Sequence, residues 1–268
     1  MSGRSSVGWL RVRAVARRHA YVLQRNPQRW FDVVVWPVVD SILFGAIGVY
    51  FGSQHGAKAA GAAFLLAGIV LFHVVFQAEI SLATGFMEET WSRNLLNLMV
   101  TPLTEGEYVT GIVLFGIAKV AMAVGTVAVV ALILFAFDLT TLGFALVPMV
   151  ALLLVIGWAV GLAVIGLILR VGQGAEILAW GVIALLLPLS GIFYPVSALP
   201  DVLQPLAQAL PTTHIFAASR AVVEGHPLPW DQLGWAALGT VVLSAFSVWF
   251  VLRMLDVFRR RGYISRHV

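Results

Sequence analysis

The fold class of this chain is decided by the stretch AAGAAFLLAGIVLFHVVFQAEI, residues 59–80. The stretch is almost entirely apolar, and its length matches the ~30 Å hydrocarbon core of a lipid bilayer. Over all 268 residues, 60% are hydrophobic and 11% are charged, which is more apolar surface than a soluble domain of this length can bury. Because backbone groups in lipid must be satisfied within each segment, such stretches form helices rather than strands. The sequence therefore predicts an all-α integral membrane protein.

Several apolar stretches are long enough to predict six transmembrane helices. They are Trp30–Gly52, Ala59–Ile80, Tyr108–Phe137, Leu142–Leu169, Ile177–Phe193 and Leu233–Leu255. An even number of spans places both termini on one side of the membrane, and that side receives fourteen Lys and Arg residues against two on the other. The positive-inside rule therefore predicts that both termini are cytoplasmic. We expect a multi-pass protein of the cytoplasmic membrane, with a six-span domain over 30–255 and a basic cytoplasmic tail over 256–268.

The basic N-terminal segment, residues 1–29, has the pattern of an amphipathic helix. Its arginines at positions 4, 11, 18 and 25 recur every seven residues and so share one side of a helix, which ends at the helix-breaking pair Asn26-Pro27. We expect this helix to lie in the cytoplasmic interface of the membrane; a disordered basic tail is the alternative. The net charge of +4 indicates contact with anionic lipids rather than nucleic acid, because the charges flank membrane spans.

A short charged segment separates the second and third spans. It contains four of the thirteen carboxylates of the chain: Glu88, Glu89, Glu105 and Glu107. Between them, Trp91, Leu95, Leu98 and Met99 share one face of a short helix that ends near Thr101-Pro102. Such a helix could float at the interface, or it could bind another protein. Anionic lipid would repel the carboxylates, which favours a protein partner.

The segment before the last span, about 194–225, contains four prolines at intervals of five or six residues. They are Pro195, Pro200, Pro205 and Pro211. The intervening DVLQPLAQAL is apolar but too short to cross a bilayer. We expect it to enter the outer leaflet and return; a surface loop with a helix lying flat is the alternative.

Ionisable residues inside the predicted spans are candidates for a functional role. Asp40 and His73 lie deepest and either line a substrate pathway or form a polar contact between helices. Glu79 and Glu176 lie near cytoplasmic ends, where their side chains can reach water. Lys119 is expected to pair with a carboxylate, for which Asp40 lies at a suitable depth.

Two other function classes follow from the same residues. The ionisable residues allow an ion-coupled secondary transporter, although no inverted repeat is evident between residues 30–137 and 142–255. An intramembrane enzyme is disfavoured because no nucleophile–base pair is visible.

The chain has no cysteine, so it has no thiolate metal site, and we predict no metal site. It also lacks the phosphate-binding motif GxxxxGK[ST], so any ATP hydrolysis belongs to a partner.

Two segments carry a family resemblance. WSRNLLNLMVTPLTEGEYVTG, residues 91–111, resembles the intracellular segment of ABC-2-type exporter permeases. LSGIFYPVSALPDVLQPLAQALPTTHIFAASRAVVEG, residues 189–225, is similar to the segment that follows the fifth span in that family. The order of the elements agrees with the family over nearly the whole chain.

The resemblance implies a membrane subunit of an ATP-driven exporter. Two permease copies, expected to be a homodimer, would form one pathway for a lipid-linked glycan, a lipid or an amphiphilic drug. Two cytoplasmic ATPase subunits would bind ATP and Mg, and this chain would bind no cofactor. The charged segment, about 88–104, would be the coupling helix that docks on the ATPase, with docking residues Glu88, Glu89, Arg93, Asn94, Thr101 and Pro102. The external segment would close the exit side, with gate residues Tyr194, Pro195, Pro200 and Pro211.

Overall fold

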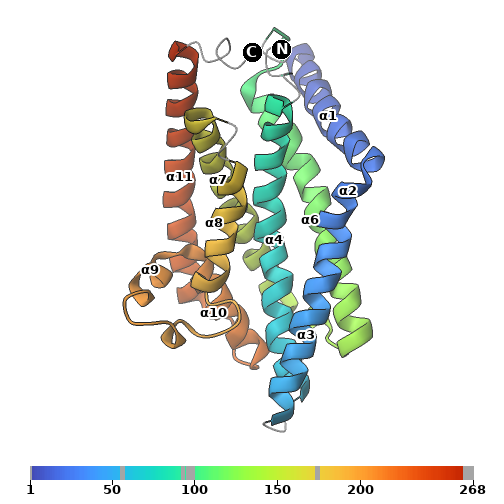
Figure 1. The fold of residues 1–268 in the computed structure, drawn as a ribbon, viewed down its shortest axis with the longest axis vertical. Helices are drawn as coiled ribbons and strands as arrows, with labels where there is room; N and C mark the ends of the chain where they lie inside the picture. Colours follow the sequence, from blue (N-terminus) through green and yellow to red (C-terminus); the bar gives the residue numbers. More distant parts are fainter. Residues whose placement is uncertain (1, 55–57, 92–93, 95–99, 173–175, 262–268) are drawn as a thin grey trace.

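The structure is a computed structural model that describes residues 2–54, 58–91, 94, 100–172 and 176–261. Within these ranges the chain is helical and contains no strand, which confirms the all-α class. The long helices run side by side along the longest axis of the molecule (Figure 1). The first residues of α1 and the last residues of α11 lie at the same end of this bundle, which we call the terminal end; the other is the opposite end.

The helices follow one another in this order: α1 (Ser2–Arg25), α2 (Pro27–Trp30), the π-helix η1 (Phe31–Val35), α3 (Trp36–Gln54), α4 (Lys58–Trp91), α6 (Glu105–Phe135), the 3-10 helix η2 (Leu139–Ala145), α7 (Leu146–Val171), α8 (Glu176–Leu189), the 3-10 helix η4 (Val196–Ala198), α9 (Gln204–Ala209), α10 (Pro211–Val223) and α11 (Trp230–Arg261).

Five helical segments of the described chain are long and apolar enough to cross a membrane. They are Phe31–Gln54, Gly61–Glu89, Glu105–Phe135, Leu139–Val171 and Trp230–Phe258. These segments confirm five of the expected spans. The fifth expected span, Ile177–Phe193, falls on α8, which has 14 residues and is therefore about 21 Å long. By length alone, α8 is shorter than the hydrocarbon core.

Helix α4 forms the centre of the bundle. In its apolar stretch 83% of the residues are buried, against 17% in α11, and it packs against α3, α6, α7, α8 and α10. Its contact with α3 is closest at two glycines. A Cβ added to Gly48 would lie 2.5 Å from the carbonyl oxygen of Gly61, so only glycine allows the two backbones to approach this closely.

Helix α1 lies against α6 at the terminal end (Figure 1). It ends at Arg25, in agreement with the break expected at Asn26-Pro27. Val12 and Leu23 are buried in this contact, whereas Trp9 is exposed. Whether α1 lies in a membrane interface remains a prediction.

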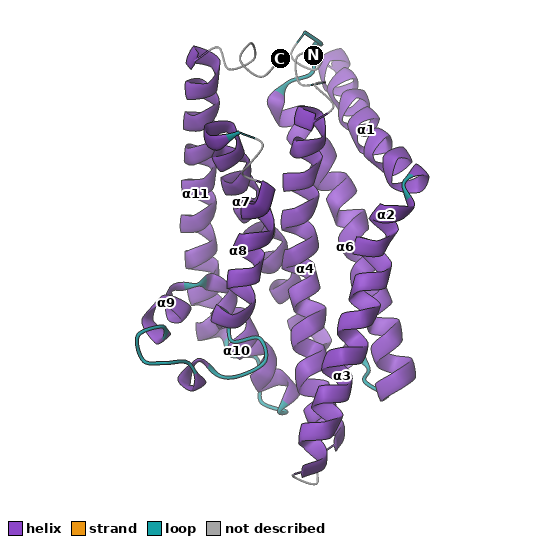
Figure 2. Cartoon of the chain, viewed as in Figure 1, coloured by secondary structure: helices purple, strands orange, loops and turns teal. Residues whose placement is uncertain are grey.

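The segment between α8 and α11 forms a group of turns and short helices at the opposite end (Figure 2). It contains η4, α9 and α10, and α10 packs against α11 and α4. The expected segment 194–225 therefore exists as a packed unit, and its depth in a membrane remains a prediction.

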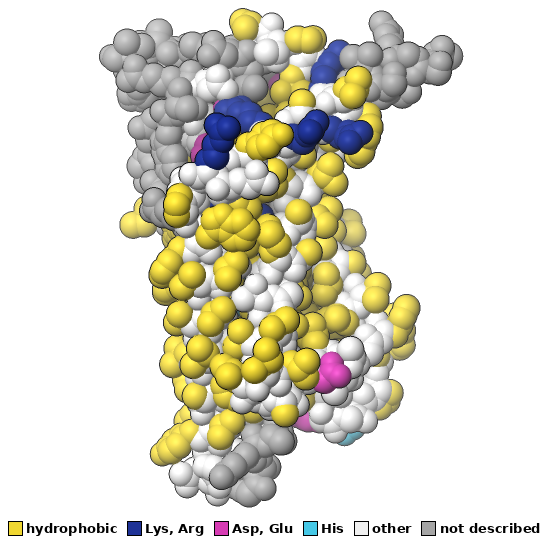
Figure 3. All heavy atoms as spheres, turned by 90° about the vertical axis from the view of Figure 1, so that its right-hand side faces the viewer, with side chains coloured by type: hydrophobic (Ala, Val, Ile, Leu, Met, Phe, Trp, Pro, Cys, Tyr) yellow, Lys and Arg dark blue, Asp and Glu magenta, His cyan; other side chains and the backbone are white. Residues whose placement is uncertain are grey.

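The surface differs between the two ends. On the face shown in Figure 3, Lys and Arg side chains gather near the terminal end, and hydrophobic side chains cover the body below them. Large exposed apolar residues lie on α3, α6 and α11, among them Trp36, Leu132 and Trp249. A surface of this kind suits contact with lipid or with another membrane protein.

Candidate functional site

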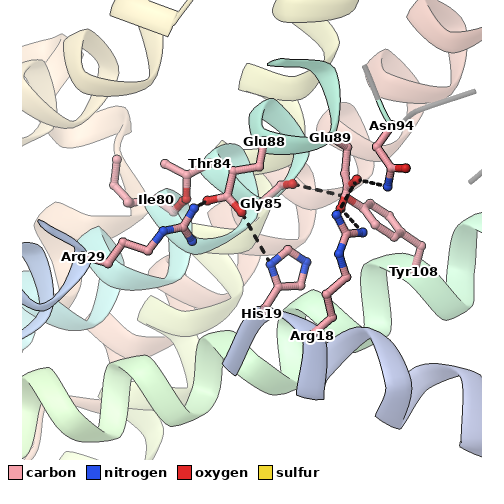
Figure 4. Close-up of polar contacts among 10 residues, drawn as sticks. All are labelled: Arg18, His19, Arg29, Ile80, Thr84, Gly85, Glu88, Glu89, Asn94 and Tyr108. Atoms are coloured by element: carbon pink, nitrogen blue, oxygen red, sulfur yellow. Dashed lines mark hydrogen bonds and ion pairs between the residues drawn. The ribbon is translucent and has the colours of Figure 1, made fainter. Parts of the chain in front are cut away.

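The two ends of the charged segment between α4 and α6 are bound by arginines of the N-terminal helices. Three ion pairs make up this arginine–glutamate cluster: Arg11–Glu107, Arg18–Glu89 and Arg29–Glu88. Figure 4 shows the pairs of Arg18 and Arg29 and their surroundings. Arg11 and Arg18 lie on α1, which packs against α6, and Arg29 lies on α2.

Glu89 is the most buried carboxylate of the cluster, with a side chain that is 0% exposed. Arg18 Nη1 lies 2.5 Å from Glu89 Oε1, and Arg18 Nη2 donates to Oε2 at 3.0 Å. Asn94 Nδ2 donates to the same Oε2 at 2.8 Å, and the Asn94 backbone N–H donates to the Glu89 carbonyl. Arg18 thus donates one hydrogen bond to Oε2 and makes a close charge contact with Oε1. Glu89 therefore connects α4 to α1 and to the segment after α4.

Glu88 faces Arg29 and His19 (Figure 4). His19 Nδ1 lies 3.8 Å from Glu88 Oε2, too far for a hydrogen bond. Burial lowers the pKa of His19 from 6.5 to about 4, against the opposing effect of nearby Glu89. His19 is therefore neutral at pH 7, and its ring stacks on Phe115 with centroids 5.8 Å apart.

The start of α6 is fixed by a capping box. The Glu107 backbone N–H donates to Thr104 Oγ1 at 3.2 Å, and the Thr104 backbone N–H donates to Glu107 Oε2 at 2.9 Å. Arg11 Nη1 lies 3.2 Å from Glu107 Oε2 and donates to the Pro102 carbonyl at 2.7 Å. The same carboxylate thus caps α6 and binds α1.

The expected docking residues fall into two groups. Glu88 and Glu89 form the end of α4, and both carboxylates bind arginines of the same chain. Thr101 and Pro102 are exposed, so a partner could reach them. Arg93 and the apolar positions 95, 98 and 99 lie outside the described residues. The coupling role of the segment therefore remains a prediction.

Sequence reasoning missed the contributions of Arg11, Arg18 and Arg29, which were expected to face lipid headgroups. The seven-residue spacing of Arg11 and Arg18 placed them correctly on one side of α1, but no local pattern identifies a carboxylate on another helix as their partner. The capping box was visible as Thr104 and Glu107 in TEGE, the pattern that marks a helix start.

The structure brings together the two deep residues Asp40 and His73. His73 Nε2 lies 3.3 Å from Asp40 Oδ2, and the His73 side chain is fully buried between α3 and α4. The expected pairing of Lys119 with Asp40 is wrong, because the charged groups that act on Lys119 are Asp32 of η1 and Arg29. Whether Asp40 and His73 line a pathway remains a prediction.

Glu79 differs from expectation. Its side chain does not reach water: it is 0% exposed, and neither carboxylate oxygen has a hydrogen-bond partner in the described chain. The α4 backbone at Glu79 packs closely on glycines of α7, since a Cβ at Gly161 would lie 3.0 Å from the Glu79 carbonyl oxygen. The side chain of Glu176 lies outside the described part.

The expected gate residues sit in separate contacts at the opposite end. Tyr194 Oη donates to the Pro188 carbonyl at 2.7 Å, and the Pro195 and Pro200 carbonyls close short turns. Pro211 begins α10 and is buried beside α11, where a Cβ at Gly239 would lie 3.0 Å from its ring. Their role as a gate remains a prediction.

The same segment has a polar centre that the sequence did not indicate. Arg220 of α10 donates to the carbonyl oxygen of Gly191, and burial lowers the pKa of this guanidinium. Ser190 Oγ lies 2.6 Å from Thr212 Oγ1 in a buried contact. Within the described ranges, no group of three or more His, Cys, Asp or Glu side chains could hold a metal ion.

Comparison with known proteins gives a consistent assignment. Residues 11–223 match the family model described as ABC-2 type transporter. The inner membrane transport permease YadH of Escherichia coli K12 is 23% identical over 217 residues, covering 79% of this chain and 82% of the relative. Nodulation protein J of Sinorhizobium fredii is 27% identical over 272 residues, covering 91% and 98%. The chain therefore belongs to the ABC-2 type transporter family and is a membrane transport permease.

Proposed function

We propose that this chain is the membrane subunit of an ATP-driven exporter. Two copies enclose one pathway, and each copy docks on a cytoplasmic ATPase subunit that binds ATP and Mg. The chain itself contributes no nucleotide site, because it has no phosphate-binding loop. The cargo is a lipid-linked glycan, a lipid or an amphiphilic drug.

The proposed topology has six spans and cytoplasmic termini. It takes α8 as the fifth span, since α8 leads from α7 at the terminal end to the short helices at the opposite end (Figure 1). The short length of α8 suits a span that the external segment completes in the outer leaflet. The positive-inside rule places the terminal end, with its basic residues, in the cytoplasm.

The arginine–glutamate cluster is the observation that carries the proposal. The segment between α4 and α6 is bound to α1 on both sides, at Glu89 before it and at Pro102 and Glu107 after it. A partner that displaces this segment therefore displaces α1 and two spans together. This is the arrangement expected of a coupling element, in which a local contact moves packed helices as units.

The docking test changes residues of this segment other than those of the three ion pairs. Arg93→Ala combined with Thr101→Ala keeps all six residues of the arginine–glutamate cluster, so the permease should fold and insert. We expect recovery of the ATPase with the tagged permease to fall about tenfold, a loss of about 1.4 kcal/mol, or ATP hydrolysis to continue without transport in vesicles. Asp201→Ala at the opposite end is the matched control. A double variant that binds its ATPase and transports like the parent would exclude the coupling role.

A further inference from the structure

Helix α4 carries a row of polar residues along one face from its terminal end to its middle. The row, which we call the α4 polar face, consists of His73, Gln77, Ser81, Thr84 and Glu88. Spacings of three and four residues place these side chains on the same side of the helix. Glu88 and His73 are 15 positions apart, about 22 Å along the axis. His73 lies near the midpoint of the apolar stretch Gly61–Glu89. The row therefore reaches from the bundle end to about the middle of the membrane.

The α4 polar face meets polar groups of other elements along its length. At the terminal end Glu88 faces His19 and Arg29. Further in, Gln77 Nε2 donates to the backbone oxygen of Asp32 in the π-helix η1 at 2.8 Å. The row ends at the pair of His73 with Asp40. Polar contacts of this kind are rare in lipid-embedded helices and mark functional positions.

A cavity of about 250 Å³ lies beside the outer part of this row, where Ser81, Thr84 and Glu88 line it. Its charged lining consists of Arg29, Asp32, Glu88 and Lys119, two cations and two anions, to which Ser81 and Thr84 add hydroxyl groups. Any bound anion would face a carboxylate, and any bound metal cation would face an ammonium or guanidinium group. Water, which both donates and accepts hydrogen bonds, is the occupant that fits such a lining.

Several buried polar groups along this route have no hydrogen-bond partner in the described chain. His19 Nε2, Gln77 Oε1 and both ring nitrogens of His73 are buried and have no hydrogen-bond partner among the described residues. Lys119, which is 8% exposed, contributes its buried ammonium group to the cavity lining. Buried polar atoms without a protein partner are generally bonded to internal water. These atoms thus extend the hydrated region from the cavity towards the middle of α4.

The route is closed beyond His73. From Ala62 to Phe72, α4 is apolar and mostly buried. There α3 and α4 approach so closely that a Cβ at Gly48 would lie 2.5 Å from the carbonyl oxygen of Gly61. Water cannot pass such a contact. The polar route therefore connects the middle of the bundle with the terminal end alone.

We propose that the α4 polar face is a hydrated path by which protons from the terminal end bind at the Asp40–His73 pair. A hydronium ion in the path transfers a proton to the neutral imidazole and leaves water behind. The pair changes from a neutral imidazole beside a carboxylate, with net charge −1, to an imidazolium–carboxylate pair with net charge 0. Because the pair joins α3 to α4, proton binding strengthens the contact between the first two spans.

Other charged groups on the neighbouring elements lie at a different depth from the pair. Asp32 of η1 and Lys119 of α6 line the cavity between the pair and the terminal end. Helices α7 and α8 carry Arg170 and Glu176 at their terminal-end extremities, and α6 starts with Glu105, Glu107 and Tyr108. Helix α10 carries His214 and Arg220 at the opposite end. Asp40 is thus the charged group that directly contacts His73.

Site-directed labelling tests the path. The chain has no cysteine, so Ser81→Cys and Ala83→Cys each create a single thiol. Both parent residues are buried on α4, but only Ser81 lines the cavity. In sealed vesicles, we expect a membrane-impermeant methanethiosulfonate to label S81C about tenfold faster than A83C, a barrier difference of about 1.4 kcal/mol, and only from the terminal end. Equal rates, or labelling of S81C from the opposite end, would overturn the path. Monodisperse elution of both variants confirms folding.

Proton binding is measured directly by nitrogen NMR of the histidine rings in nanodiscs, with His73→Gln to assign the signal. We expect the His73 ring to change from its neutral to its protonated form as the pH is lowered over the measured range, and this change to differ in Asp40→Asn, which removes the carboxylate but keeps the shape. A His73 ring that keeps one protonation state over this range would refute the proton site. Because neither experiment contains an ATPase, the result is independent of the proposed exporter function.

Discussion

Different interactions stabilise the terminal end and the opposite end of the molecule. At the terminal end, ion pairs join residues far apart in the sequence, such as Arg18 with Glu89 and Arg11 with Glu107. At the opposite end, neutral hydrogen bonds such as that of Ser190 with Thr212, and the part-buried guanidinium of Arg220, join residues 22 and 29 positions apart. Charges respond to pH, salt and an approaching partner, whereas short-range neutral contacts do not. The difference indicates a responsive terminal end and a rigid opposite end.

Lowering the pH should produce the largest difference in stability between the two ends, because His19 lies at the terminal end. Its pKa is about 4 in the folded protein and 6.5 when exposed. Above pH 6.5 the ring is neutral in both states; as the pH falls below 6.5, the detached form of α1 binds a proton that the docked form does not. The docking of α1 should therefore weaken, by about 3 kcal/mol near pH 4. After correction for the intrinsic pH dependence of amide exchange, protection of the α1 amides should fall below pH 6.5. Protection in the first turns of α7, at the opposite end and without an ionisable side chain, should change little.

The matched variant for this measurement is His19→Leu, which keeps an apolar side chain against Phe115 and cannot bind a proton. We expect α1 in this variant to lose most of its sensitivity between pH 6.5 and 5, before the carboxylates titrate. An unchanged pH response in the variant would assign the effect to other groups.

Arg18→Ala tests the ion pairs of the terminal end. The change leaves the fully buried Glu89 without its guanidinium partner. Removing one partner of a buried pair costs 3–5 kcal/mol, but Arg18 is 44% exposed, so we expect a loss of about 2 kcal/mol. The loss should appear as faster exchange and proteolysis in α1.

Two further variants sharpen this result. Arg17→Ala removes an exposed neighbouring charge and should have little effect. Adding Glu89→Gln to Arg18→Ala removes the uncompensated charge and should restore part of the lost stability. If the double variant is no more stable than Arg18→Ala alone, the buried charge is not the cause.

Arg220→Ala is the corresponding change at the opposite end. It removes the donor to the carbonyl oxygen of Gly191, a residue with φ +61° that shapes the turn after α8. We expect a loss of about 1.5 kcal/mol, typical of a hydrogen bond from a charged group. Since the acceptor is a neutral carbonyl, the loss should not depend on salt, whereas the effect of Arg18→Ala should shrink as salt rises. Equal salt dependence at both ends would contradict the comparison.

The sequence predicted the long helices but not their ends or their partners. The apolar residues predict that the second span ends at Ile80, yet α4 continues to Trp91. In this added part Glu88 and Glu89 form ion pairs with arginines of other helices. The fifth span was expected to reach Phe193, but α8 ends at Leu189, one residue after Pro188. Hydrophobic length predicts which segments enter the membrane. It cannot predict ion pairs such as Arg18–Glu89, which depend on how distant helices pack.

Thr104→Ala should have the smallest effect, confined to the start of α6. The change removes the hydroxyl that accepts from the Glu107 backbone N–H and so leaves a helix N–H without its cap, at a cost of about 1 kcal/mol. Exchange of the first-turn amides of α6 should accelerate, with a smaller change in α1, because Glu107 keeps its contact with Arg11. Thr110→Ala is the matched control in the same helix, since its hydroxyl donates only to the Gly106 carbonyl and contributes little to a helix. Similar amide exchange in Thr104→Ala and Thr110→Ala would show that the cap does not stabilise the terminal end. The ion pairs of the arginines would then be the main interactions that stabilise it.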